Sequence, residues 1–220
     1  MTRTRRKHRR RLNPRFIVLC LTVGLLAAGG GLWWLNRGLP GEDVELPDWV
    51  QEELIPVNEW SRPALPLKQI NGVVIHYVGN PGTTAQANRN YFASLANGEE
   101  KTYASSHFVV GLEGEVVQCI PLTEIAYATG PRNQDTIAIE VCHPDSGGEF
   151  SEVTYDRMVE LTAFLCRTFD LDPGTEVIRH YDVTEKICPK YYVEHPEAWE
   201  ALRADVCAAL ETMKKEERNQ

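Results

Sequence analysis

The chain has 220 residues, and its 31 aspartates and glutamates outnumber its 23 lysines and arginines, which gives a formal net charge of −8. All 31 acidic residues follow residue 37, so the chain beyond that point is strongly acidic. A surface of that sign repels phosphate backbones, and we therefore exclude nucleic acid as a partner.

The first 36 residues have the charge and hydropathy pattern of a membrane anchor. Residues 1–15 contain eight lysines and arginines and no acid, and residues 16–36 are almost entirely apolar. About 20 such residues in a helix cross the roughly 30 Å hydrocarbon core of a bilayer. The basic flank is expected to stay cytoplasmic, which makes the chain a single-pass membrane protein with its remainder outside the cytoplasm. A cleaved secretory signal is the alternative, because LAAGGG contains small residues, and it also exports the domain.

The remainder divides into a spacer, one domain and a short tail. Residues 37–66 are rich in acids and prolines, and we interpret them as a spacer that packs in part near Trp49 and Trp60. Residues 67–212 have the usual length of a single domain and are long enough to bury a core. Residues 213–220 form a charged C-terminal tail.

Strand and helix signals alternate through residues 67–212. Residues 72–77 are predicted to form a buried apolar strand, and residues 107–120 a hairpin that turns near Glu113 and Gly114. Residues 136–142 and 175–180 add two strands.

Two helices are expected, one after the strand at residues 136–142 and one after the strand at residues 175–180. Thr154 is the predicted cap of a helix whose apolar side chains recur at steps of three and four from Met158 to Phe169. Pro196 opens another, because proline suits the first helical turn. The predicted fold is α/β, with a mixed central β-sheet flanked by helices.

Three residues near predicted strand ends are candidate metal ligands. His76 and His180 each close a strand, and Cys188 follows eight residues after His180. Open sheets place their sites at strand ends, so these side chains are expected to meet. Two imidazoles and a thiolate suit zinc and leave one tetrahedral position for water. Taken singly, each residue is more often structural than metal-binding, a histidine as part of a core and the cysteine as a buried apolar residue or half of a disulfide, and only their conjunction favours a metal site.

Four motifs in this region resemble those of the zinc N-acetylmuramoyl-L-alanine amidases, which include phage amidase endolysins and peptidoglycan recognition proteins. They are IHY with His76, SSHFVVGLEGEVVQCIP, IAIEVC with Glu140, and RHYDVTEKICP. The resemblance covers roughly residues 68–210. It implies that the substrate is peptidoglycan, that Zn²⁺ is the cofactor, and that the bond cleaved joins the lactyl group of N-acetylmuramic acid to L-alanine of the stem peptide.

The resemblance also implies a role for each matching residue. It makes His76, His180 and Cys188 the zinc ligands, Glu140 the general acid/base and Lys186 a cation beside the metal. A carboxylate there can carry the proton of the attacking water, and a fixed cation can stabilise the developing oxyanion. Without the motif, Glu140 and Lys186 would be interpreted as solvated side chains.

The chain departs from the family pattern at two positions. Ala128 stands where many relatives have a histidine, and Ser106 stands where some have a tyrosine. Three nearby polar residues are candidate substrate contacts, although burial or ordinary surface polarity explains them equally well: His107, Arg132 and Asn133.

The alternatives to a monomeric amidase domain are a membrane-tethered module that binds peptidoglycan without cutting it and, more distantly, a zinc peptidase acting on stem-peptide bonds.

Four further cysteines are open to pairing in an exported domain. Cys166 and Cys207 can meet if the two predicted helices pack together, whereas Cys119 and Cys142 are expected to stay reduced.

Overall fold

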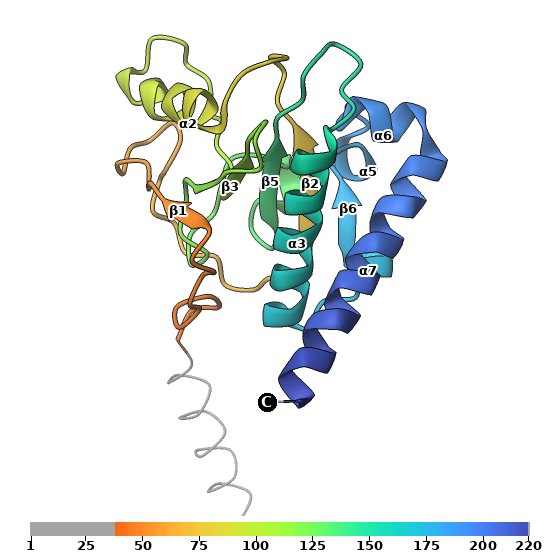
Figure 1. Cartoon of the computed structure of the whole chain (residues 1–220). Coiled ribbons are helices and arrows are strands. Elements are labelled where there is room, and N and C mark those ends of the chain that lie inside the picture. The colour runs from red at the N-terminus through yellow and green to blue at the C-terminus, as the bar shows by residue number, and fades with distance from the viewer. Residues whose placement is uncertain (1–37, 220) are drawn as a thin grey trace, which may run out of the picture. The chain divides into compact units, whose positions relative to one another are not determined.

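In residues 38–219, which the computed structural model describes, six strands form one mixed sheet (Figure 1). The strand order is β1-β4-β3-β5-β2-β6. The pair β3–β4 is antiparallel and all other neighbours are parallel. The strands are β1 (Val50–Glu52), β2 (Val73–Tyr77), β3 (Phe108–Val110), β4 (Val116–Gln118), β5 (Ile137–Val141) and β6 (Val177–Arg179).

The predicted basic tail and membrane anchor, residues 1–15 and 16–36, lie outside the described residues. Within residues 38–219, none of the helices has both the length and the apolar character that a membrane span requires.

The four strand regions expected after residue 66 are confirmed as β2, the β3–β4 hairpin, β5 and β6. The hairpin turns at Gly114, which has a φ of 78°, and the Gly111 N–H donates to the Glu115 carbonyl at 2.7 Å. This left-handed φ is one that glycine adopts without steric cost.

The two predicted helices are also present, with one correction. α3 begins at Glu152, and its cap is Ser151, whose side chain accepts the Thr154 N–H, so the assignment of the cap to Thr154 was wrong. Thr154 lies inside the first turn, and its buried hydroxyl donates to the Gly111 carbonyl at 3.0 Å. The helices are α2 (Ala85–Ser94), η1 (Leu95–Asn97), η2 (Gly130–Arg132), α3 (Glu152–Phe169), α4 (Pro173–Glu176), α5 (Tyr181–Thr184), α6 (Lys190–Glu194) and α7 (Pro196–Arg218).

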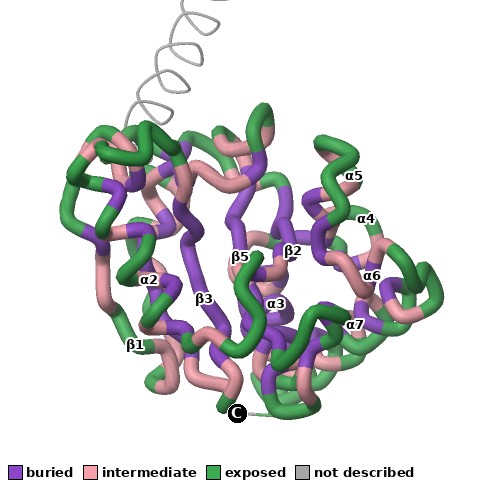
Figure 2. The backbone as a smooth tube through the Cα atoms, turned by 90° about the horizontal axis from the view of Figure 1, so that it is seen from above, coloured by how far each residue is buried: buried purple, intermediate pink, exposed green. Residues whose placement is uncertain are grey.

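The sheet has two differently covered faces. α3 and α7 lie side by side against one face, where Ile75 of β2 and Ile139 of β5 are fully buried (Figure 1). On the other face α2 packs over β3 and β4, with Val109 and Phe92 in its core. Strands β2, β3 and β5 are buried over most of their length (Figure 2). Because strand side chains alternate between faces, the residues next to Ile75 and Ile139 point to the α2 side.

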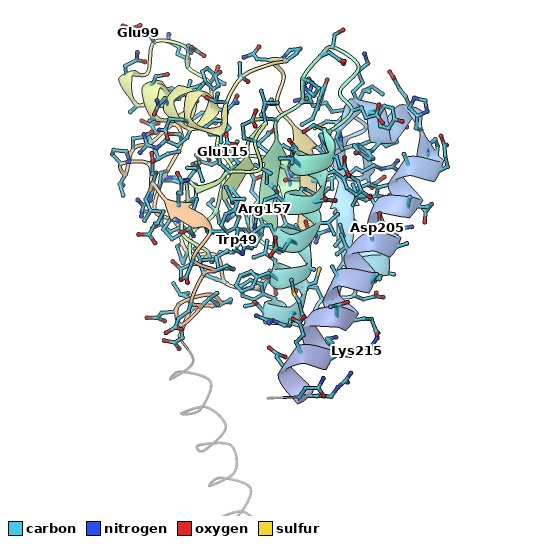
Figure 3. All side chains as sticks on the ribbon, in the orientation of Figure 1. Trp49, Glu99, Glu115, Arg157, Asp205 and Lys215 are labelled. Atoms are coloured by element: carbon cyan, nitrogen blue, oxygen red, sulfur yellow. The ribbon has the colours of Figure 1, made fainter. Side chains whose placement is uncertain are left out.

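The segment interpreted as a spacer is packed on this domain from Leu39 onward. It supplies the edge strand β1, and Ile55 is fully buried with its N–H donating to the Cys119 carbonyl at 2.9 Å. The Arg157 guanidinium of α3 lies 4.6 Å from the centre of the Trp49 ring, a cation–π contact between two residues that are labelled near each other in Figure 3. The segment therefore belongs to the folded unit.

The five cysteines within residues 38–219 are all free thiols. α3 and α7 pack together as the proposed pairing requires, but Cys166 on α3 and Cys207 on α7 are not joined. Cys119 and Cys142 are reduced, as expected.

Candidate metal centre

The centre begins with two polar side chains on neighbouring strands. His76 of β2 is in register with Glu140 of β5 in the parallel pair. Both alternate with core residues that face α3 and α7, so both side chains point to the α2 side of the sheet. His76 is 1% exposed, whereas the Glu140 side chain keeps 18% exposure, and His76 Nδ1 lies 3.9 Å from Glu140 Oε1.

His180 and Cys188 reach the same place from the end of β6. The His180 N–H donates to the carbonyl of Ile75 at 3.3 Å, which aligns the residue after β6 with the end of β2. The chain then passes through α5 and returns, and the Tyr181 N–H donates to the Cys188 carbonyl at 2.9 Å. His76 and His180 have ring centres 4.6 Å apart. The predicted meeting of these residues is therefore confirmed in geometry.

The three side chains fit a metal ion. The ligand atoms of His76, His180 and Cys188 all lie within 4.8 Å of one another, and all three residues are buried. His76 Nδ1 and Cys188 Sγ are 3.8 Å apart. A tetrahedral zinc with bonds of about 2.0 Å to nitrogen and about 2.3 Å to sulfur separates such atoms by roughly 3.5 Å. The buried Nδ1 of His180 has no hydrogen-bond partner among the described residues, as expected of an atom reserved for a cation.

The electrostatics of the site point the same way. Burial raises the pKa of the Cys188 thiol to about 12 and holds the pKa of His76 well below its usual 6.5. Burial also lowers the pKa of His180 to about 4. Two neutral imidazoles are ready to donate lone pairs, and the thiol needs a nearby cation to lose its proton. A divalent cation would supply that charge.

Glu140 is the acidic group of the site. Burial raises its pKa to about 8, and the positive charge of Lys186 partly offsets that rise. Its Oε2 is buried and has no hydrogen-bond partner among residues 38–219. Lys186 lies on the exposed loop after α5, and its charge also lowers the pKa of both histidines. The structure thus brings His76, His180, Cys188 and Glu140 together, and the charge of Lys186 acts on the two histidines and on Glu140.

The three residues predicted to contact substrate make contacts within the protein instead. His107 is 1% exposed, its Nδ1 accepts the Ala138 N–H at 3.0 Å, and its Nε2 lies 2.9 Å from the Glu124 carbonyl. Its ring therefore joins two backbone segments and offers no atom to a substrate. Arg132 forms an ion pair with Asp135 at 2.7 Å.

Asn133 has its side chain turned to the backbone. Its Oδ1 accepts the N–H of Ala128 at 3.1 Å and of Thr129 at 2.6 Å, which fixes the loop before η2. Thr129 is a site residue that the sequence interpretation missed, and its Oγ1 lies 3.2 Å from His76 Nε2. The available signal was its place beside Ala128, in the segment where the chain departs from the family pattern.

The fold and this centre define a class of protein. A profile of the N-acetylmuramoyl-L-alanine amidase family matches residues 66–191, which is more than half of the chain. The chain belongs to this family, and the resemblance seen in its motifs is confirmed.

Among curated relatives, the chain is similar to the N-acetylmuramoyl-L-alanine amidase BlyA of Bacillus subtilis (strain 168), with 33% identity over 176 residues, which cover 71% of this chain and 46% of BlyA. It is 31% identical over 173 residues to the N-acetylmuramoyl-L-alanine amidase CwlL of Bacillus licheniformis, covering 73% of this chain and 47% of CwlL. The chain thus spans about half the length of these relatives.

Solved structures share the fold. PlyL superimposes with a TM-score of 0.61 at 21% identity, over 71% of this chain and 96% of PlyL. The catalytic domain of XlyA gives a TM-score of 0.60 at 23% identity, over 71% of this chain and 98% of that domain. The α/β class with a central sheet and flanking helices is thereby confirmed.

Proposed function

We propose that the domain hydrolyses peptidoglycan at the amide between the lactyl group of N-acetylmuramic acid and L-alanine of the stem peptide. The observation that carries this proposal is the buried set of His76, His180 and Cys188 with Glu140 in register beside it. Membership of the amidase family supports the choice of bond.

The donor set supports Zn²⁺ as the resident ion, held by His76, His180 and Cys188. When bound, zinc supplies a polarised scissile carbonyl and a water molecule of lowered pKa. Glu140 takes the proton of the attacking water, a role supported by its buried Oε2, which has no hydrogen-bond partner among residues 38–219. It then delivers that proton to the amine nitrogen of the leaving L-alanine.

Lys186 supplies the fixed positive charge. Its ammonium group is close enough to lower the pKa of Glu140, which favours the carboxylate that acts as base. A fixed cation near the reacting carbonyl stabilises the negative charge that develops on its oxygen. Because the loop after α5 is exposed, substrate can cover Lys186 and strengthen this interaction.

Mass spectrometry of digested sacculi tests the proposal. The zinc-loaded wild type is expected to release intact stem peptides with a free L-alanine amino end. Glu140→Gln should still bind one zinc per chain while its turnover falls by about 10² to 10⁴. Cleavage within the stem peptide would identify a peptidase, and binding without release would identify a recognition module.

We also propose that residues 16–36 keep the domain on the cell membrane, with residues 1–15 in the cytoplasm. The uncharged run and its basic flank support this topology. Protease added outside intact spheroplasts should remove the domain and leave a short membrane-protected fragment. A soluble mature protein that starts near Gly30 would show instead that the segment is a cleaved signal.

A further inference from the structure

The loop between β4 and β5 places a buried hydroxyl group behind His76. Thr129 is 1% exposed, and its Oγ1 lies 3.2 Å from His76 Nε2. The opposite ring nitrogen, Nδ1, faces the centre, at 3.8 Å from Cys188 Sγ and 3.9 Å from Glu140 Oε1. The two nitrogens of one imidazole are thus divided between a protein hydroxyl and the metal site.

We propose that Thr129 is a positioning residue that holds His76 in the tautomer required for metal binding. This inference rests on the zinc site proposed above. A hydroxyl oxygen accepts the proton of Nε2, which leaves the lone pair of Nδ1 directed at the centre. Metal-bound histidines usually donate their second N–H to a carboxylate, carbonyl or water, and here a threonine takes that place.

The hydroxyl is held in place by the backbone. Asn133 Oδ1 accepts two consecutive N–H groups, at 3.1 Å from Ala128 and 2.6 Å from Thr129. The Asn133 N–H in turn donates to the Gly130 carbonyl at 3.2 Å, which closes the turn of η2. Because threonine is also stiff about χ1, its Oγ1 has little freedom to leave His76.

This arrangement gives a role to the segment that departs from the family pattern. Ala128 cannot supply an imidazole, but the loop that carries it is buried against the centre through the next residue. Through Thr129, the segment contacts His76 at Nε2, the ring nitrogen opposite the one that faces Cys188.

Matched substitutions separate this role from simple packing. Thr129→Val keeps the shape and removes the acceptor, while Thr129→Ser keeps the acceptor. Thr162→Val is the control, because Thr162 is fully buried on α3 and donates to the Met158 carbonyl at 2.7 Å. The zinc dissociation constant is measured in the full chain by competition with a chromophoric chelator. The ¹⁵N chemical shifts of the His76 ring are measured in the metal-free protein.

Thr129→Val is expected to weaken zinc binding by about 10-fold to 100-fold. Thr129→Ser and Thr162→Val should stay within about 3-fold of wild type, well below that loss. The wild-type ring should show protonated Nε2 and unprotonated Nδ1, and valine should shift the signals toward the other tautomer.

Wild-type affinity in Thr129→Val would overturn the inference and leave the amidase proposal intact. If Thr129→Val fails to fold, the wild-type ring signals decide, because a proton on Nδ1 would refute the assignment without any variant. A wild type that binds no zinc would overturn the metal site and this inference together, whereas release of stem peptides tests the amidase reaction separately.

Discussion

The raised pKa of Glu140 predicts that the metal-free protein loses stability as the pH rises through neutrality. Burial of Glu140 in the folded protein raises its pKa from 4.5 to about 8. Between these values the folded state keeps a proton that the unfolded state has lost. The stabilising contribution is therefore complete below pH 4.5 and disappears as the pH rises through 8.

The two histidines limit the pH range in which the Glu140 contribution can be measured to its upper part. His76 and His180 have lowered pKa values in the folded protein, so protonation in the unfolded state opposes folding below their usual 6.5. In the unfolded state both are half protonated at pH 6.5 and almost fully neutral by pH 8, a change that wild type shares with Glu140→Gln. From pH 6.5 to 8 the Glu140 contribution should thus fall by roughly 1.5 kcal/mol, since a tenfold change in a proton-binding constant corresponds to about 1.4 kcal/mol.

Urea denaturation in the presence of a chelator measures this change. The free energy of unfolding is determined at several pH values for wild type, Glu140→Gln and Glu211→Gln. Glu211 is an exposed residue of α7 and serves as the control. Glu140→Gln should lack the extra decline between pH 6.5 and 8, and saturating zinc should remove that decline from wild type. Parallel curves for wild type and Glu140→Gln would refute the reasoning.

Three further predictions test the site and the N-terminal segment. Cys188→Ser should lose stoichiometric zinc and activity, whereas Cys188→Asp should keep zinc and some turnover because carboxylate is also a zinc ligand, as atomic emission and stem-peptide release will show. Lys186→Met should lower turnover by about 10²-fold with zinc content unchanged, as measured by the same pair of assays. Ile55→Ala should reduce the free energy of unfolding by about 3 kcal/mol in urea, because Ile55 is fully buried, whereas Val57→Ala should change it little because Val57 is 63% exposed.

Strands and long helices could be predicted because their signals are local. β2 and β5 are continuous apolar runs, and α3 and α7 have apolar side chains at helical spacing. α2 was not predicted because its local apolar pattern is weak. Its only buried residues are Ala85, Asn88 and Phe92, so one polar and one small residue dilute its apolar stripe.

The N-terminal segment shows how distant partners override composition. Its acids and prolines are typical of a spacer, yet Arg62 forms two 2.8 Å hydrogen bonds with Glu124, and Arg89 donates to the Leu54 carbonyl at 2.9 Å. These partners lie 62 and 35 residues away in the chain. No local pattern marks such contacts, so the packing of residues 39–66 was not predictable beyond its tryptophans.

The polar side chains near the site differ in whether their atoms are already hydrogen-bonded to backbone groups. His107 and Asn133 were candidate contacts because polar side chains near a catalytic motif often bind substrate, but both ring nitrogens of His107 and the Oδ1 of Asn133 make hydrogen bonds or close contacts with peptide groups. Sequence identifies a polar side chain but does not show which backbone groups will surround it. For these two residues only the fold distinguishes support from recognition.

The atoms left without partners carry the chemical information. Four buried side-chain atoms in the described part of the chain have no hydrogen-bond partner, and two of them are His180 Nδ1 and Glu140 Oε2. Gln118 Oε1 and Arg203 Nε are the others, so an unpaired atom alone does not define a site. His180 Nδ1 and Glu140 Oε2 are distinguished by their position beside His76. The His180 ring packs against the His76 ring, and Glu140 is in register with His76 on the neighbouring strand. Under the proposed function, the lone pair of His180 Nδ1 would bind the cation and Oε2 of Glu140 would carry the proton, both beside one buried imidazole.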